Sequence, residues 1–167
     1  MASSLRERVE FAEFATALTP RMFRKALLLC GEWHLAEDLV QTTWTNLYRS
    51  WRKVDRADNP AAYALAALTK TFLSHKRSRS SSERPQLVVI DQAQSDPDLA
   101  TRMAVLDALS KLGTLDRTII VLRYWEDQSV EQTAAAVGLS PGAVKTRSHR
   151  ALTVLRKQLT SMEEEAS

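Results

Sequence analysis

Apolar residues recur three or four positions apart along much of the chain, which is the spacing of a helix with one buried face. The clearest such stretch is residues 35–51, and residues 11–30 follow a similar pattern. Within the latter, Pro20 is placed to open a second helix, and Gly31 is suited to end it. Residues 61–77 predict a further helix that begins apolar and ends basic.

Two polar stretches interrupt this pattern. Residues 52–60 are polar and end in an Asn-Pro pair, which favours a loop before the next helix. Residues 78–97 combine a serine cluster with two prolines and show no sustained helical period. They predict a flexible linker, because a compact domain rarely contains so long a loop. We therefore expect two small helical domains, residues 1–79 and 98–167, joined by a linker at 80–97.

After the linker the helical spacing returns. Residues 99–112 predict one amphipathic helix that Gly113 ends, and residues 115–125 predict another. Composition agrees with this pattern, since the 167 residues include only 4 Gly and 5 Pro, and 44% are hydrophobic. These values disfavour both a β architecture with many turns and a disordered chain. The predicted fold class is all-α.

Residues 129–159 carry the most informative pattern in the chain. Ser129 can cap a short helix, Gly138 suits a tight turn, and the Ser140-Pro141 pair can cap and begin a second helix. A short helix, a tight turn and a second helix, with small residues where the helices cross, form the pattern of a DNA-binding helix-turn-helix. The alternative is a plain helical hairpin with a solvated basic face.

The distribution of charge favours DNA binding. The whole chain has a formal net charge of only +3, yet residues 132–162 contain basic residues and no acidic ones. An ordinary solvated helix mixes charges of both signs, whereas positive charge alone fits phosphate. On the second helix, Arg147 and Arg150 are expected at phosphates and the other exposed positions at base edges. The candidate DNA-binding residues here are Ser140, Gly142, Lys145, Thr146, Arg147, His149 and Arg150.

A second basic cluster lies at residues 70–84, so the other domain also has an electropositive end. Tyr63 and Phe72 belong to the same predicted helix. Basic residues interleaved with aromatic ones can bind single-stranded nucleic acid through phosphate attraction and base stacking. Aromatic residues at helical spacing are more often core, which is the interpretation we favour for Phe72, while both remain open for Tyr63.

Glu37 and Asp38, followed by Gln41, stand near the start of the helix at 35–51. Acids in a first helical turn can simply complement the helix macrodipole, and this alternative is as good as a functional one.

The sequence offers no catalytic pattern and no metal-ligand spacing. Its one cysteine cannot form an internal disulfide, and the three histidines are scattered. It has no phosphate-binding loop and no nucleophile set, so we expect neither an enzyme nor a cofactor. It also lacks a signal peptide and a long apolar run, which predicts a soluble cytoplasmic protein.

Taken together, three stretches resemble bacterial RNA polymerase sigma factors of the extracytoplasmic-function (ECF) group, in the sigma-70 family, and within that group the SigE-like subfamily. The stretches are HLAEDLVQTTWTNLYRSW, DNPAAYALAALTKTFLSHKR and LDRTIIVLRYWEDQSVEQTAAAVGLSPGAVKTRSHRAL. The resemblance covers about residues 11–159, and the order of the stretches is more specific than any one of them.

The resemblance implies an alternative sigma factor that binds RNA polymerase core and directs promoter recognition and transcription initiation. Residues 1–79 would be sigma region 2 and residues 98–167 sigma region 4, whose helix-turn-helix would read the −35 element. The clamp helices of the large polymerase subunit would contact Glu37, Asp38, Leu39, Val40 and Gln41. The −10 element would contact Asn59, Tyr63, Lys70, Thr71, His75, Lys76 and Arg77.

Two positions depart from the family pattern. Lys70 stands where many members have an asparagine that contacts the −10 strand, and Ser148 stands where a larger apolar residue is usual. The family also makes an anti-sigma factor a further expected partner, beside promoter DNA. A stand-alone helix-turn-helix regulator with an N-terminal effector or dimerisation domain is the alternative function, and it accounts for one domain only. A recombinase-like enzyme would lack its nucleophile.

Overall fold

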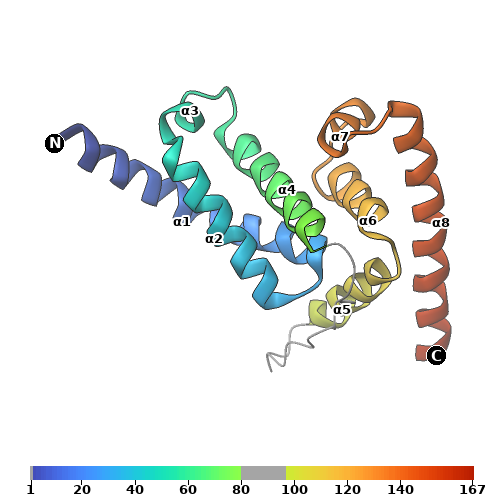
Figure 1. Ribbon diagram of the computed structural model, residues 1–167. Coiled ribbons are helices and arrows are strands. Elements are labelled where there is room, and N and C mark those ends of the chain that lie inside the picture. Colours follow the sequence, from blue (N-terminus) through green and yellow to red (C-terminus); the bar gives the residue numbers. More distant parts are fainter. Residues whose placement is uncertain (1, 80–96) are drawn as a thin grey trace. The chain divides into compact units, whose positions relative to one another are not determined.

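The computed structural model describes residues 2–79 and 97–167, and every regular element in these two ranges is helical (Figure 1). The all-α prediction is confirmed. The chain divides into two compact units, residues 1–88 and residues 89–167, which are called unit 1 and unit 2 below. The predicted linker at 80–97 lies outside the described residues, except for Pro97, where a helix begins.

Unit 1 is built from three packed helices and one short one. Their bounds are α1 (Ala2–Cys30), α2 (Trp33–Arg49), α3 (Trp51–Asp55) and α4 (Pro60–Ser78). Helices α1, α2 and α4 each pack against the other two, and Figure 1 shows α2 and α4 side by side. Their shared core consists of large apolar side chains, which include Met22, Leu29, Leu39, Leu47, Leu68 and Phe72.

Helix α1 continues through Pro20, so the expected start of a second helix there is wrong. Contacts in the turn before the proline account for this. The Thr19 hydroxyl donates to the Ala15 carbonyl at 2.6 Å and accepts from the Trp44 indole N–H at 3.0 Å. Packing against α2 therefore holds this turn helical, although proline cannot donate its own backbone hydrogen bond.

The polar loop before α4 is also shorter than expected. Residues 51–55 form α3, because Trp51 and Val54 turn inward and are buried. Burial of these two side chains stabilises a helical turn whose other residues are polar. The connection to α4 is thereby reduced to residues 56–59. Gly31 does end α1, and its φ of 72° lies in the left-handed region that glycine adopts readily.

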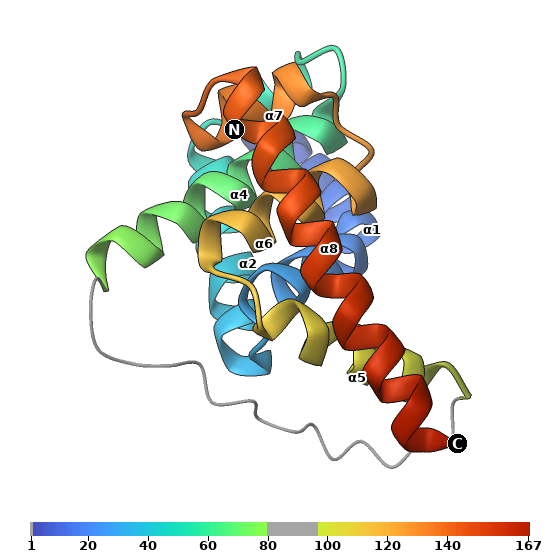
Figure 2. The same ribbon diagram turned by 90° about the vertical axis from the view of Figure 1, so that its right-hand side faces the viewer.

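Unit 2 contains the remaining elements. They are α5 (Pro97–Ser110), α6 (Thr114–Ile120), a π-helical turn η1 (Val121–Trp125), α7 (Val130–Val137) and α8 (Pro141–Ala166). Helix α8 packs against α5, α6 and α7, and Figure 2 shows it passing in front of them. At the crossing of α6, α7 and α8 the core consists of Ile119, Ala134 and Val144. The two helices expected at 99–112 and 115–125 are thus present, the second as α6 continued by η1.

Candidate functional site

Helices α7 and α8 form the predicted helix-turn-helix. Ser129 and Gln132 cap α7 reciprocally, each side chain bonding to the other residue's backbone N–H, at 3.0 and 2.9 Å. Gly138 then ends α7 with a φ of 73°, and the Ser140 hydroxyl accepts from the Ala143 N–H at 3.1 Å to cap α8. Local residues therefore fix where both helices begin and where the turn between them lies.

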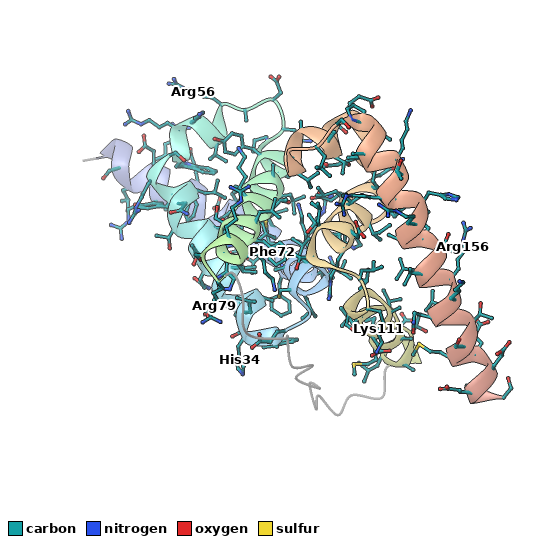
Figure 3. The ribbon with its side chains drawn as sticks, turned by 45° about the vertical axis from the view of Figure 1, so that its right-hand side comes forward. His34, Arg56, Phe72, Arg79, Lys111 and Arg156 are labelled. Atoms are coloured by element: carbon teal, nitrogen blue, oxygen red, sulfur yellow. The ribbon has the colours of Figure 1, made fainter. Side chains whose placement is uncertain are left out.

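The N-terminal half of α8 presents one basic face to solvent. Val144 packs with Ile119 of α6 and Ala134 of α7, and Ala151 is also buried. The exposed side includes most of the predicted DNA-binding residues: Ser140, Gly142, Lys145, Thr146, His149 and Arg150. In Figure 3, Arg156 likewise points away from α8. Such a face, with cations on one side and an apolar anchor on the other, suits the major groove of DNA.

Arg147 differs from these residues. Its guanidinium Nη1 lies 2.8 Å from Asp116 Oδ1 in α6, and both side chains are about one-third exposed. The residue was expected to contact DNA phosphate, but here it joins two helices of the same unit. Sequence reasoning missed Asp116 altogether, because the two residues are far apart in the chain.

Ser148 faces the core of unit 2. Its side chain is 6% exposed, and its hydroxyl has no hydrogen-bond partner among the described residues. Thr133 in α7 shares this property. The position at which the family prefers a larger apolar residue is therefore an interior one.

The basic end of unit 1 lies on α4. Lys70, Arg77 and the side chain of Asn59 are exposed, whereas Tyr63, Thr71, His75 and Lys76 are half-buried. Asn59 Oδ1 caps α4 by accepting from the Ala62 N–H at 3.1 Å. Phe72, labelled in Figure 3, is fully buried, which confirms the core interpretation. The Lys76 ammonium lies 6.0 Å from its ring centre.

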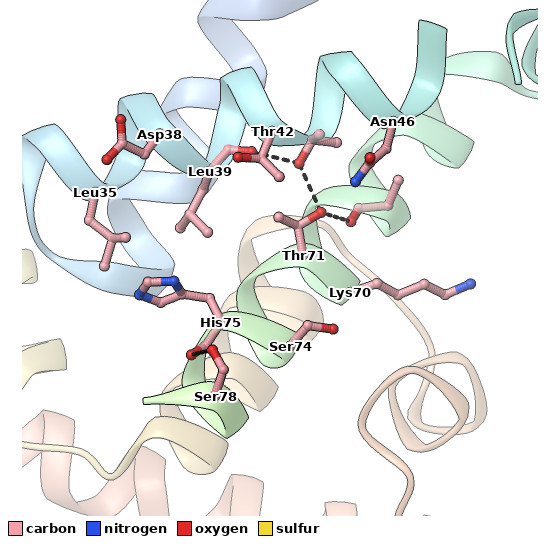
Figure 4. A pocket seen from close by; sticks show the side chains of 12 residues that line it. Leu35, Asp38, Leu39, Thr42, Asn46, Lys70, Thr71, Ser74, His75 and Ser78 are labelled. Carbon is pink, nitrogen blue, oxygen red and sulfur yellow. Dashed lines mark hydrogen bonds between the residues drawn. The ribbon is translucent and has the colours of Figure 1, made fainter. Parts of the chain in front are cut away.

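Three of the predicted −10 contacts, Lys70, Thr71 and His75, line a groove between α2 and α4 (Figure 4). The groove has a volume of about 740 Å³, and Asp38, Thr42 and Asn46 of α2 line its opposite wall. On its floor the hydroxyl oxygens of Thr43 and Thr71 lie 3.1 Å apart. The sequence assigned Asp38 to polymerase binding, and nothing in it indicated that Thr42 and Asn46 would join Asp38 in this wall.

The predicted polymerase-binding segment on α2 is split by burial. Glu37, Asp38 and Gln41 are exposed, but Leu39 and Val40 are each only 3% exposed and belong to the core of unit 1. Any partner of this helix therefore meets its polar side.

The macrodipole alternative for these acids is not supported. Helix α2 begins at Trp33, and its first turn contains no acidic residue. Glu37 and Asp38 lie a full turn later, where the effect of the helix terminus has already fallen off. Glu37 Oε1 instead accepts a 2.6 Å hydrogen bond from the Trp33 indole N–H.

Within residues 2–79 and 97–167, no group of three or more His, Cys, Asp or Glu side chains is arranged to hold a metal ion. In the same ranges no helix is long and apolar enough to cross a membrane.

Comparison with protein families matches both units. Sigma-70 region 2 matches residues 14–82, and sigma-70 region 4 matches residues 102–155. The chain is 33% identical over 162 residues to the RNA polymerase sigma-E factor of Streptomyces coelicolor, covering 96% of this chain and 92% of that protein. It is 32% identical over 152 residues to the ECF RNA polymerase sigma factor SigL of Mycobacterium tuberculosis, covering 84% of each.

A solved structure agrees in fold as well as in sequence. The sigma factor RpoE from Bartonella quintana, determined in complex with the anti-sigma factor NepR, is 26% identical and superposes with a TM-score of 0.67. The match covers 90% of this chain and 97% of that one. The two region matches, the near full-length relatives and this shared fold lead to one conclusion: the chain belongs to the sigma-70 family of RNA polymerase sigma factors, in its ECF group and close to the sigma-E factors, and is an alternative sigma factor for promoter recognition.

Proposed function

We propose that the two units divide promoter recognition between them. Unit 1, as sigma region 2, binds RNA polymerase core through α2 and the −10 element through α4 and the turn before it. Unit 2, as sigma region 4, reads the −35 element with α8. The linker at 80–97 joins them, so neither unit needs to bind tightly alone. The observation that carries this proposal is the exposed basic face of α8, anchored by Val144 and Ala151.

Each surface has a distinct role. On α8, Lys145 and Thr146 reach base edges, while Arg150 binds phosphate. On unit 1, the exposed amide of Asn59 and the ring of Tyr63 capture an unpaired base. Their contacts offset the free energy of flipping that base out of the duplex, which is on the order of a few kcal/mol. Lys70 and Arg77, both exposed on α4, attract the backbone of the melted strand.

The protein has no catalytic step of its own in this account, and the chemistry belongs to the polymerase, with which it acts in the cytoplasm. Since the structurally similar RpoE was solved with an anti-sigma factor, we include such a protein among the proposed partners. The stand-alone regulator is not favoured, because sigma families match both units and not the helix-turn-helix alone.

The proposed function is tested by adding the full chain to core polymerase and measuring run-off transcription on genomic fragments. We expect transcripts from a small set of fragments that share one −10 and one −35 sequence, and none from core alone. Specific binding of the chain to operator-like DNA without any core-dependent transcription would support the stand-alone regulator instead.

Core binding can be tested separately. The variant Glu37→Gln with Asp38→Asn removes two charges from α2, yet glutamine keeps an acceptor for the Trp33 indole. Because charges at the edge of an interface are worth little singly, we expect a weakening of about three- to ten-fold in a core pull-down. Glu13→Ala, which removes an exposed acid from α1, is the matched control. Equal affinity of both variants would remove this surface from the proposal.

A further inference from the structure

The ion pair between Arg147 and Asp116 links the DNA-facing helix to the helix behind it. Arg147 lies in the second turn of α8 and Asp116 in the first turn of α6, with 2.8 Å between Nη1 and Oδ1. The side chains are 36% and 29% exposed, so the pair lies at the edge of the helix contact and water reaches both partners. A pair in this setting contributes modest stability.

The pair matters because α8 has few other anchors in this region. The buried residues of α8 are Val144, Ser148 and Ala151, all small or medium in size. One of them, Ser148, places an unpartnered hydroxyl in the core. Three such side chains bury much less apolar area than leucines would, and a loosely packed contact leaves the angle of a helix poorly defined. A guanidinium bonded to the neighbouring helix restricts that angle.

The same bond changes what Arg147 offers to DNA. Its charge is already balanced by a carboxylate, whereas the side chains of Lys145 and Arg150 are exposed on either side of it along α8. Asp116 also places a negative charge beside the DNA-facing helix, and a negative charge near phosphate opposes binding. If Arg147 served only as a phosphate contact, Asp116 would be a hindrance.

We propose that Asp116 is a positioning residue for −35 recognition, which acts by holding Arg147 so that α8 keeps the orientation in which Lys145 and Thr146 reach base edges. This inference rests on the proposed role of α8 and adds a residue from α6 to it. Under this inference, Arg147 stabilises the orientation of α8 and does not contact the phosphate backbone.

The two possible roles of Arg147, phosphate contact and helix positioning, predict opposite changes in DNA affinity for one substitution. Asp116→Asn removes a negative charge near DNA, so a phosphate-binding Arg147 would gain affinity from it. Under the positioning role, Asp116→Asn weakens binding to specific −35 DNA by about three- to ten-fold, since the lost pair no longer fixes the helix. The salt dependence of binding stays unchanged, because no phosphate contact is lost.

The experiment measures binding of holoenzyme to promoter DNA with the specific or a scrambled −35 element, over a range of salt concentrations. The variants are Asp116→Asn, Arg147→Gln, both together, and Arg147→Lys, which can still pair with Asp116. Circular dichroism fixes a temperature at which all of them are folded. We expect both single variants and the double variant to lose the same amount on specific DNA, and Arg147→Lys to keep most of the affinity.

Two results with the variants would overturn the inference and leave the proposed function of α8 in place. In one, Asp116→Asn binds as well as the natural protein or better. In the other, Arg147→Gln lowers the salt slope by about one unit and weakens specific and scrambled DNA alike, which is the signature of a lost phosphate contact. If the natural protein itself failed to distinguish specific from scrambled −35 DNA, the proposed function of α8 would fall, and this inference with it.

Discussion

The two units are both small and helical, but their interiors differ. Unit 1 buries large apolar side chains such as Met22, Leu68 and Phe72, beside the rings of Trp44 and Trp51. Phe11 and Phe14 of α1 pack edge-on or tilted against these two rings, with ring centres 5.2 to 5.8 Å apart. At the crossing of α6, α7 and α8 in unit 2 the buried apolar cluster is smaller, Ile119, Ala134 and Val144, although unit 2 also buries Leu109, Val121 and Leu122.

Buried polar groups show the same contrast. In unit 1 the ammonium of the fully buried Lys25 donates to the Leu65 carbonyl at 2.7 Å, and Thr43 donates to the Leu39 carbonyl at the same distance. Unit 2 contains buried side-chain atoms without a hydrogen-bond partner, at Arg123, Gln128, Thr133 and Ser148, whereas the described part of unit 1 contains none. We infer that unit 1 is the more rigid scaffold and that the recognition helix of unit 2 depends on a few small contacts.

The largest expected effect comes from removing a large side chain from unit 1. Phe72→Ala should lower the free energy of unfolding of unit 1 by about 3–5 kcal/mol, through lost apolar burial and the cavity left behind. Hydrogen exchange on the full chain, read separately for α4 and α8, measures this. Protection of α8 should stay unchanged, and an equal loss in both helices would contradict the independence of the two interiors.

A smaller effect is expected at the turn of the helix-turn-helix. Gly138 has a φ of 73°, in the left-handed region, whereas Gly142 does not adopt a positive φ. A Cβ added at either glycine would meet no atom within 4 Å. Gly138→Ala should therefore cost unit 2 about 1–2 kcal/mol, through backbone conformation alone.

Gly142→Ala, three residues before Lys145 on α8, is the matched control. It should stabilise the helix by up to about 1 kcal/mol, because alanine has the better helix propensity. Urea denaturation of the two variants gives the comparison. If both substitutions changed stability in the same direction, the turn would not depend on a left-handed residue.

The helix-turn-helix and the segment before α4 show which parts of the fold could be predicted from the sequence. Caps and turns depend on residues a few positions apart, so Ser129, Gly138 and Ser140 were enough to place α7 and α8. The polar loop before α4 was predicted too long, because α3 exists only through the burial of Trp51 and Val54 against other helices. Periodicity within one stretch does not contain that information.

In the candidate site, too, local patterns were predictable and contacts between separate helices were not. Exposed cations of α8 were evident from the absence of acids around them, since a one-sided charge is a local pattern. The partner of Arg147 was not evident, because Asp116 belongs to a separate helix. Thr42 and Asn46, which line the groove from α2, were not evident either. Leu39 and Val40 were placed in the polymerase-binding segment by the family resemblance, whereas their helical spacing predicts the burial that the structure shows.

The smallest expected effect sharpens the contrast in buried polar groups. Ser148→Ala removes a buried hydroxyl without a partner and should raise the free energy of unfolding of unit 2 by about 1 kcal/mol. Ser161→Ala on the same helix is the control, since that hydroxyl is exposed and bonds to the Lys157 carbonyl. Thermal unfolding distinguishes the two. Destabilisation by Ser148→Ala would show that the hydroxyl is satisfied after all.

The most direct test of the division between the units is permanganate footprinting of −10 thymines at saturating holoenzyme. One variant combines Asn59→Ser, which keeps the cap on α4, with Tyr63→Ala, and the other is Lys145→Ala in α8. We expect saturation to restore full promoter opening for Lys145→Ala, whose defect is in DNA binding. It should not do so for the unit 1 variant, whose defect is in melting. Full opening by both variants, or equally low opening by both, would contradict the assignment of melting to unit 1 and −35 recognition to unit 2.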